Sequence, residues 1–222
     1  MKRCLMVTGG PLDLDFAAGF LKDRQYDLII AVDAGFTSCL KLGIRPDLLV
    51  GDFDTFGREE ILKYRSDAGF AFDIHEPEKD ETDTELAVRD ALKAGCSEAD
   101  LLGATGGRID HELSNLYLLA QAKRQGLSVT VYDRNNRISV LDAGAGKKRE
   151  FWKETSYGTY ISFLPLTETV KGITLTGFKY PLTGKDISMR KNPGLCVSNE
   201  ICGERAVITF EDGILLCVES GD

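Results

Sequence analysis

The sequence has no excess of basic residues and no long basic run. It contains 27 Lys and Arg against 35 Asp and Glu in 222 residues, a formal net charge of −8. Its densest basic patch, "GKKREF", is short. Extended nucleic-acid binding requires a basic footprint that neutralises many phosphates, so we expect no nucleic-acid partner. A polyphosphate ligand would instead require a divalent cation or a few local basic side chains.

Long apolar runs and paired cysteines are also missing. No stretch approaches the roughly 20 apolar residues of a membrane-spanning helix, and the start, "MKRCLMVTGGPLD", is too weakly apolar to predict a signal peptide. The six cysteines are scattered without a C-x-x-C pair, which is typical of reduced thiols. We therefore expect a soluble, cytoplasmic protein with no membrane partner.

What the sequence does contain is alternation, over residues 1–133. Apolar strand-like runs ("RCLMVTG", "DLIIAVDAG", "DLLVGDF", "ADLLGAT" and "LSVTVYD") are separated by helical patterns at 14–22, 37–42, 58–64, 84–94 and 112–125. Buried strands separated by helices predict a mostly parallel sheet with helices on both faces. The fold class predicted for this part is a three-layer, Rossmann-like α/β domain.

The pattern changes over residues 134–222. Short strand-like segments such as "TYISFLPL", "AVITFEDG" and "ILLCVES" follow one another, broken by Gly, Pro and Asn. This pattern predicts an antiparallel β-sandwich domain. The turn-forming "YDRNNR" places the boundary after residue 133, so we expect two domains, 1–133 and 134–222.

Polar residues follow three of the predicted parallel strands. Asp33 follows "LIIAV", Asp52 and Asp54 follow "DLLVG", and Thr105-Gly106-Gly107 follows "DLLGA". Ligands of such sheets bind at the carboxyl ends of the strands. Asp52 and Asp54 point to one side of a strand, where two like charges repel unless a cation lies between them. Carboxylates suit Mg²⁺, although a solvated strand end is the simpler alternative.

The segment "KDETDTELA" predicts the start of a helix. Thr82 and Glu85 have the spacing of a capping box. A helix N-terminus attracts phosphate, so Lys79 and Thr82 are candidates for a phosphate site, and Asp83 could hold a metal shared with the phosphates. Helix capping alone is the alternative.

The segment "GATGGRIDH" joins a predicted strand to a predicted helix. Its glycines allow close approach of the backbone to an anion, and Arg108 can offer a bidentate fork to phosphate oxygens. Asp110 and His111 could bind metal, orient Arg108 or act as acid and base. The alternative is a tight turn with an acid in the first helical turn. The segment matches neither a Walker A nor a G-x-G-x-x-G pattern.

In the second half, "GFKYPL" and "VSNE" are unusual for sandwich loops. Tyr180 could stack on a flat ring, and Ser198 and Asn199 could hydrogen-bond a heterocycle. A packed corner and a polar turn are the alternatives.

Taken in order, "DAG" at Asp33, "PDLLVGDFD", "KDETDTELA", "GATGGRIDH", "GFKYPL" and "VSNE" resemble the thiamine pyrophosphokinase family over nearly the whole chain. The resemblance implies an α/β domain, a β-sandwich domain and a homodimer with active sites between subunits. It also implies Mg²⁺-dependent transfer of diphosphate from ATP to the hydroxyl of thiamine, with release of AMP. Family members often have D-G-G and D-F-D-S, where this chain has Ala34 and Thr55.

The resemblance also implies roles for individual residues. Asp52, Asp54 and Asp83 match the acids of the metal and phosphate site, and Ser198-Asn199 falls in the thiamine-side motif. Trp152 and Tyr180 are both candidates for the aromatic residue that stacks on thiamine. Together with the residue chemistry, this gives a catalytic set and an ATP set. The catalytic set is Asp52, Asp54, Asp83, Arg108 and Asp110. The ATP set is Asp33, Lys79, Thr82, Thr105, Gly106, Gly107 and Arg108.

The sequence allows two alternatives to this function. "DFDTF" also fits the D-x-D-x-T pattern of haloacid-dehalogenase-like phosphatases, with Asp52 as nucleophile and Asp54 as acid/base, but the later acidic pair of such enzymes is missing. The other alternative is a non-catalytic thiamine- or nucleotide-binding protein. The complete set of acids, with Arg108, argues against it.

Overall fold

The computed structural model describes residues 1–51, 71–74, 80–143 and 148–222, and for 71–74 only the backbone. Asp52, Asp54, Lys79 and the helix predicted at 58–64 lie outside these residues. Contacts between Cα atoms divide the chain into Met1–Arg134 and Asn135–Asp222. The boundary predicted from the sequence lies beside this division.

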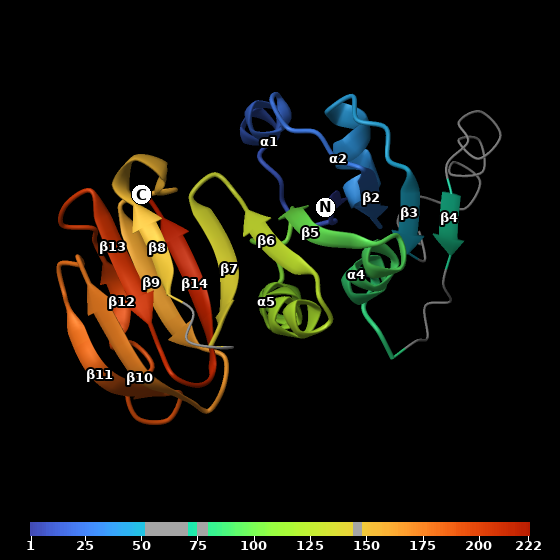
Figure 1. Cartoon of the computed structure of the whole chain (residues 1–222). Helices are drawn as coiled ribbons and strands as arrows, with labels where there is room; N and C mark the ends of the chain where they lie inside the picture. Colours follow the sequence, from blue (N-terminus) through green and yellow to red (C-terminus); the bar gives the residue numbers. More distant parts are fainter. Residues whose placement is uncertain (52–70, 75–79, 144–147) are drawn as a thin grey trace. The chain divides into compact units, whose positions relative to one another are not determined.

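The first unit is built on a parallel sheet (Figure 1). Its strands have the order β6-β5-β1-β2-β3-β4, and each neighbouring pair is parallel. The bounds are Lys2–Val7 for β1, Leu28–Val32 for β2, Leu48–Gly51 for β3, Ala71–Ile74 for β4, Cys96–Leu102 for β5 and Ser128–Tyr132 for β6.

Helices cover both faces of this sheet. Helices α1 and α2 lie on one face, and α4 and α5 lie on the other (Figure 1). None of the helices in the described ranges has the length and apolar character needed to cross a membrane. The three-layer arrangement with a mostly parallel sheet confirms the fold class predicted from the sequence. The bounds are Leu14–Leu21 for α1, Gly35–Lys41 for α2, Asp83–Lys93 for α4 and Ile109–Arg124 for α5.

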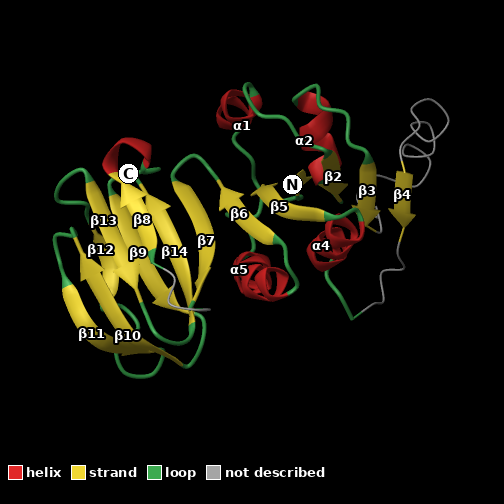
Figure 2. Ribbon diagram, viewed as in Figure 1, coloured by secondary structure: helices red, strands yellow, loops and turns green. Residues whose placement is uncertain are grey.

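The second unit contains two antiparallel sheets, with strand orders β12-β9-β14-β7 and β11-β10-β13-β8. Its described residues form strands and one short 3-10 helix, η1, at Lys153–Thr155 (Figure 2). The antiparallel sandwich is confirmed. The strands are β7 Asn136–Asp142, β8 Arg149–Trp152, β9 Tyr160–Pro165, β10 Thr169–Thr176, β11 Leu182–Ser188, β12 Cys196–Asn199, β13 Arg205–Thr209 and β14 Ile214–Ser220.

Aromatic residues form the centre of the second core. Phe151, Phe163 and Phe178 are buried and pack edge to face, with ring centroids 5.8 to 6.2 Å apart. Such pairs stabilise a core beyond the area they bury. The sequence did not predict β4, β8, β11 or β12. Strands β11 and β12 each lie at the end of their sheet's strand order and keep several side chains exposed, so their sequences lack apolar alternation.

Candidate functional site

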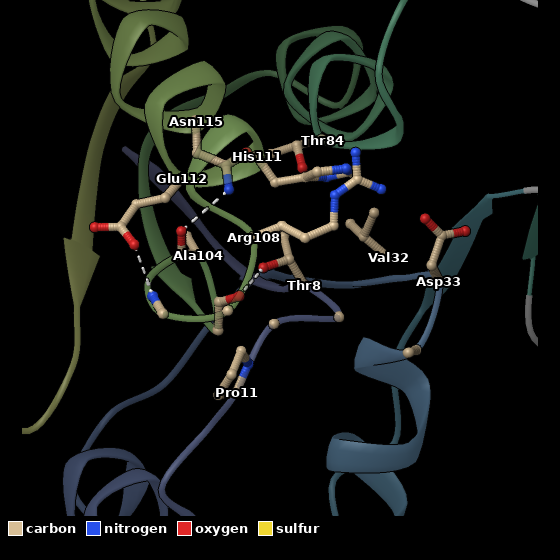
Figure 3. A pocket seen from close by; sticks show the side chains of 16 residues that line it. Thr8, Pro11, Val32, Asp33, Thr84, Ala104, Arg108, His111, Glu112 and Asn115 are labelled. Carbon is tan, nitrogen blue, oxygen red and sulfur yellow. Dashed lines mark hydrogen bonds between the residues drawn. The ribbon is translucent and has the colours of Figure 1, made fainter. Parts of the chain in front are cut away.

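A cavity of about 400 Å³ lies at the carboxyl ends of the parallel strands (Figure 3). Thr8 follows β1, Asp33 follows β2 and the loop 103–107 follows β5, so three strand ends contribute to one wall. The first turn of α5 supplies much of the rest. The lining residues are Thr8, Gly9, Gly10, Pro11, Val32, Asp33, Ala34, Thr84, Gly103, Ala104, Gly106, Gly107, Arg108, His111, Glu112 and Asn115.

Asp33 has an unusual backbone conformation at the end of β2. Its φ is +46°, and its amide donates to the carbonyl of Val50 at 3.0 Å. A Cβ added to Gly51, whose φ is +147°, would lie 1.9 Å from Asp33 Oδ1. The carboxylate of Asp33 therefore occupies space that only a glycine at 51 leaves open.

The loop after β5 approaches the segment after β1. Gly10 donates its amide to the carbonyl of Gly103 at 3.0 Å, and the Thr8 hydroxyl donates to the same carbonyl at 2.6 Å. A Cβ at Gly10 would lie 2.3 Å from this oxygen. Gly106 and Gly107 follow with φ of +76° and +80°, values that favour glycine.

Arg108 and Asp110 form a bidentate ion pair. Arg108 Nε donates to Oδ1 of Asp110 at 3.1 Å, and Nη2 donates to Oδ2 at 2.6 Å. Both side chains are exposed, with 73% and 62% of their area accessible. The hydrogen bonds from Arg108 lower the pKa of Asp110 from 3.8 to about 2. A carboxylate with so low a pKa is a weak base and a poor proton acceptor. The bidentate geometry of the pair suits Asp110 to orienting Arg108.

A second cavity, of about 320 Å³, adjoins the first and shares Asp33, Thr84, His111 and Asn115 with it. Thr82, Asp83 and Asp110 also line this cavity. Thr82 caps α4 through the predicted capping box: the Thr82 amide donates to Glu85 Oε2 at 2.6 Å, and the Glu85 amide donates to Thr82 Oγ1 at 3.2 Å. The capping box is therefore confirmed.

Three carboxylates, on Asp33, Asp83 and Asp110, line this second cavity. Among the residues that the structure describes, no three Asp, Glu, His or Cys side chains converge closely enough to cage a metal ion. Mg²⁺ does not require such a cage, because it usually binds one or two carboxylates together with water and substrate phosphates. The oxygen donors of this wall fit a divalent cation of that kind.

In the second unit, Asn199 connects two segments that carry predicted site residues. It is buried, and its Oδ1 accepts from the amides of Tyr180 at 2.9 Å and Glu200 at 3.0 Å. Its Nδ2 donates to the carbonyl of Tyr180 at 2.8 Å. Tyr180 and Ser198 are exposed, and Ser198 has a φ of +56° with its amide donated to Ser162 Oγ at 2.9 Å. Asn199 therefore positions the backbone of Tyr180.

The structure brings one group of predicted residues together. Asp33, Gly106, Gly107 and Arg108 line the first cavity, and Thr82, Asp83 and Asp110 line the second. Thr105 is in neither lining, and its hydroxyl donates to Asp133. Tyr180, Ser198 and Asn199 belong to the other unit.

Sequence reasoning missed Thr8, Glu112, Asn115 and Asp133. Thr8 had a usable signal, because it follows an apolar strand and precedes two glycines, as the recognised motifs do. The other three act through contacts with the loop after β5. Nothing in their local sequence reports those contacts.

Comparison with known proteins is consistent across both units. The family model "Thiamin pyrophosphokinase, catalytic domain" matches residues 22–131, and "Thiamin pyrophosphokinase, vitamin B1 binding domain" matches residues 149–215. A thiamine pyrophosphokinase of Bacillus subtilis is 35% identical over 222 residues, which is 100% of both chains.

Solved structures agree with the sequence matches. A crystal structure of thiamine pyrophosphokinase from Bacillus subtilis superimposes with a TM-score of 0.84 at 32% identity, covering 100% of both chains. One from Geobacillus thermodenitrificans gives 0.83 at 32% identity, covering 99% of this chain and 98% of that one. These matches do not favour the phosphatase alternative. The chain belongs to the thiamine pyrophosphokinase family.

Proposed function

We propose that this chain is a thiamine diphosphokinase that transfers the diphosphate of ATP to thiamine. The observation that carries the proposal is a 35% identical thiamine pyrophosphokinase matched over the full length of both chains. In the reaction, the thiamine hydroxyl oxygen forms a bond to the β-phosphorus of ATP. The bond from that phosphorus to the oxygen bridging to the α-phosphorus breaks, AMP leaves, and the hydroxyl loses its proton.

The first unit would bind ATP. Arg108 donates Nε and one Nη2 hydrogen to Asp110, so its other edge, Nη1 with the second Nη2 hydrogen, would donate to phosphate oxygens. The glycine loop lets the backbone approach the phosphates, and α4 presents its N-terminus beside Thr82 and Asp83. Such transfer depends mainly on positioning and charge neutralisation. Lys79 and Thr105 complete the proposed ATP set.

We propose Mg²⁺ as the divalent cation. Asp52, Asp54 and Asp83 would hold it, and only Asp83 of these three belongs to the described residues. When bound, the ion neutralises charge on the phosphate oxygens. The oxygen-only donors suit a hard cation of this size.

The second unit would bind thiamine through Tyr180, Ser198 and Asn199. Exposed Tyr180 is a candidate to stack on a thiamine ring, and Asn199 fixes its backbone. Ser198, exposed and strained at φ +56°, offers a hydroxyl. Replacing Ser198 by Ala is expected to raise the thiamine KM more than the ATP KM.

We also propose a cytoplasmic homodimer with active sites between subunits. Ile109, Leu113 and Tyr117 support self-association, because they are exposed and recur every four residues on α5. All six cysteines, each within the described ranges, are free thiols, as a reducing compartment would keep them. Sedimentation of the purified chain tests the dimer, and a monomer at all concentrations contradicts it.

The direct test of function is AMP release from ATP, with and without thiamine. Thiamine-dependent AMP that EDTA abolishes and excess Mg²⁺ restores supports the proposal. Asp54→Asn should lose turnover while its circular dichroism stays unchanged. Binding of ATP and thiamine without turnover would instead support the non-catalytic alternative.

A further inference from the structure

We propose that Glu112, Asn115 and Asp133 are positioning residues that hold the glycine loop after β5 in the shape that receives the ATP phosphates. The inference rests on the proposed function of the loop. It adds three residues that touch the loop and not the reacting atoms.

Three consecutive loop residues are each held by a different side chain. Asn115 Nδ2 donates to the carbonyl of Ala104 at 3.2 Å. Thr105 Oγ1 donates to Asp133 Oδ2 at 2.8 Å. The amide of Gly106 donates to Glu112 Oε2 at 2.9 Å. Figure 3 shows the contacts of Asn115 and Glu112 as dashed lines from the first turns of α5 back to the loop.

These contacts compensate for the flexibility of the loop. Gly106 and Gly107 have positive φ and no side chain to fix them. Ordering the loop therefore loses a large amount of backbone conformational entropy. Glu112 and Asn115 are three residues apart on one face of α5, which is the spacing needed to hold one segment from a helix. The loop is thereby ordered before a ligand arrives, which lowers the cost of binding.

The contact with Glu112 also determines which loop donors are left for a ligand. The Gly106 amide is used by Glu112. Within the described part of the chain, no acceptor is found for the amides of Gly107 and Arg108, and both residues line the first cavity. Glu112 therefore binds one edge of the loop and leaves the next two amides to an anionic ligand.

The test compares Glu112→Ala with Glu112→Gln, which keeps an acceptor oxygen. Glu98→Ala is the matched control, because Glu98 is exposed near the start of β5, at the strand end opposite the loop. The first readout is hydrogen exchange of the Gly106 amide by NMR, which requires no activity. The second is the KM for ATP and for thiamine.

We expect Glu112→Ala to speed exchange at Gly106 and to raise the ATP KM about three- to tenfold, the loss of one hydrogen bond. The thiamine KM should not change, and Glu112→Gln should restore both readouts. A merely structural role would lower stability and the active fraction without separating the two KM values.

The double variant Glu112→Ala with Asn115→Ala should raise the ATP KM by less than the product of the two single fold-changes, because both side chains hold the same loop. Exchange at Gly106 and an ATP KM equal to those of Glu98→Ala would overturn the inference. A lowered ATP KM would also overturn it, because it would mean that the carboxylate competes with phosphate. If the wild-type chain shows no thiamine-dependent AMP release, the proposed function fails. The exchange measurement still tests whether the loop is held.

Discussion

At the residue scale, the ion pair between Arg108 and Asp110 is an electrostatic feature of the candidate site. The guanidinium donates twice to the carboxylate, and this holds the pKa of Asp110 at about 2. Because the pKa in the folded chain is below the ordinary value, the pair stabilises the loop above about pH 4 and is lost as the pH falls through about 2. Both groups are exposed, so the effect on global stability is small.

The first prediction concerns this pair. In Arg108→Ala, the pKa of Asp110 should rise toward its ordinary 3.8, because the variant removes the Arg108 hydrogen bonds that lower this pKa most. An NMR titration of the Asp110 carboxyl carbon measures this directly. The variant should also lose ATP affinity, whereas Arg124→Ala, at the far end of α5, should change neither property. An unchanged midpoint in Arg108→Ala would show that the pair does not form in solution.

The second prediction concerns Gly51. Gly51→Ala should lower the free energy of unfolding by about 1 to 3 kcal/mol, because the residue has a positive φ and the new Cβ meets Asp33. It should also raise the ATP KM, since Asp33 must move away from the cavity wall.

Gly43→Ala is the control for Gly51→Ala. Gly43 has a φ of +68° with no atom near the added Cβ, so this variant has the backbone strain alone. Chemical denaturation and ATP kinetics of both variants separate strain from displacement of Asp33. Equal ATP KM values for the two variants would contradict the role given to Asp33.

At the element scale, the N-terminus of helix α4 contributes both to the stability of the fold and to the lining of the second cavity. Its capping box satisfies backbone N–H groups that the helix itself cannot satisfy. Thr82→Ala should therefore lower the free energy of unfolding by about 1 kcal/mol, and Thr82→Ser should retain most of it. Urea denaturation measures both. If Ala and Ser variants unfold at the same urea concentration, the cap contributes nothing.

The sequence predicted the elements that are marked by a pattern within a few consecutive residues. The strands β1, β2, β3, β5 and β6 each contain a short group of apolar residues, and α4 begins at its predicted cap. Strands β11 and β12 were missed because an exposed edge strand needs no alternating pattern. The sequence predicted Asn199 as a thiamine contact, but it did not predict that the Asn199 amide holds Tyr180, 19 residues away in sequence. Contacts at that separation depend on the fold and leave no local pattern.

At the scale of the whole molecule, the two units present different kinds of chemical group. The α/β unit presents strand ends, a glycine loop and helix N-termini, which suit phosphate and a cation. The sandwich unit presents Tyr180 and Ser198 from its loops and edge strand. This division agrees with the two family models, which match one unit each.

The central claim is that diphosphate moves as one group from ATP to thiamine. The most direct measurement is ³¹P NMR of the purified chain with equal ATP, thiamine and Mg²⁺. The account predicts that AMP and thiamine diphosphate appear together in equal amounts, with no ADP or thiamine monophosphate at any time. Formation of ADP with thiamine monophosphate would contradict it, because the enzyme would then transfer a single phosphoryl group.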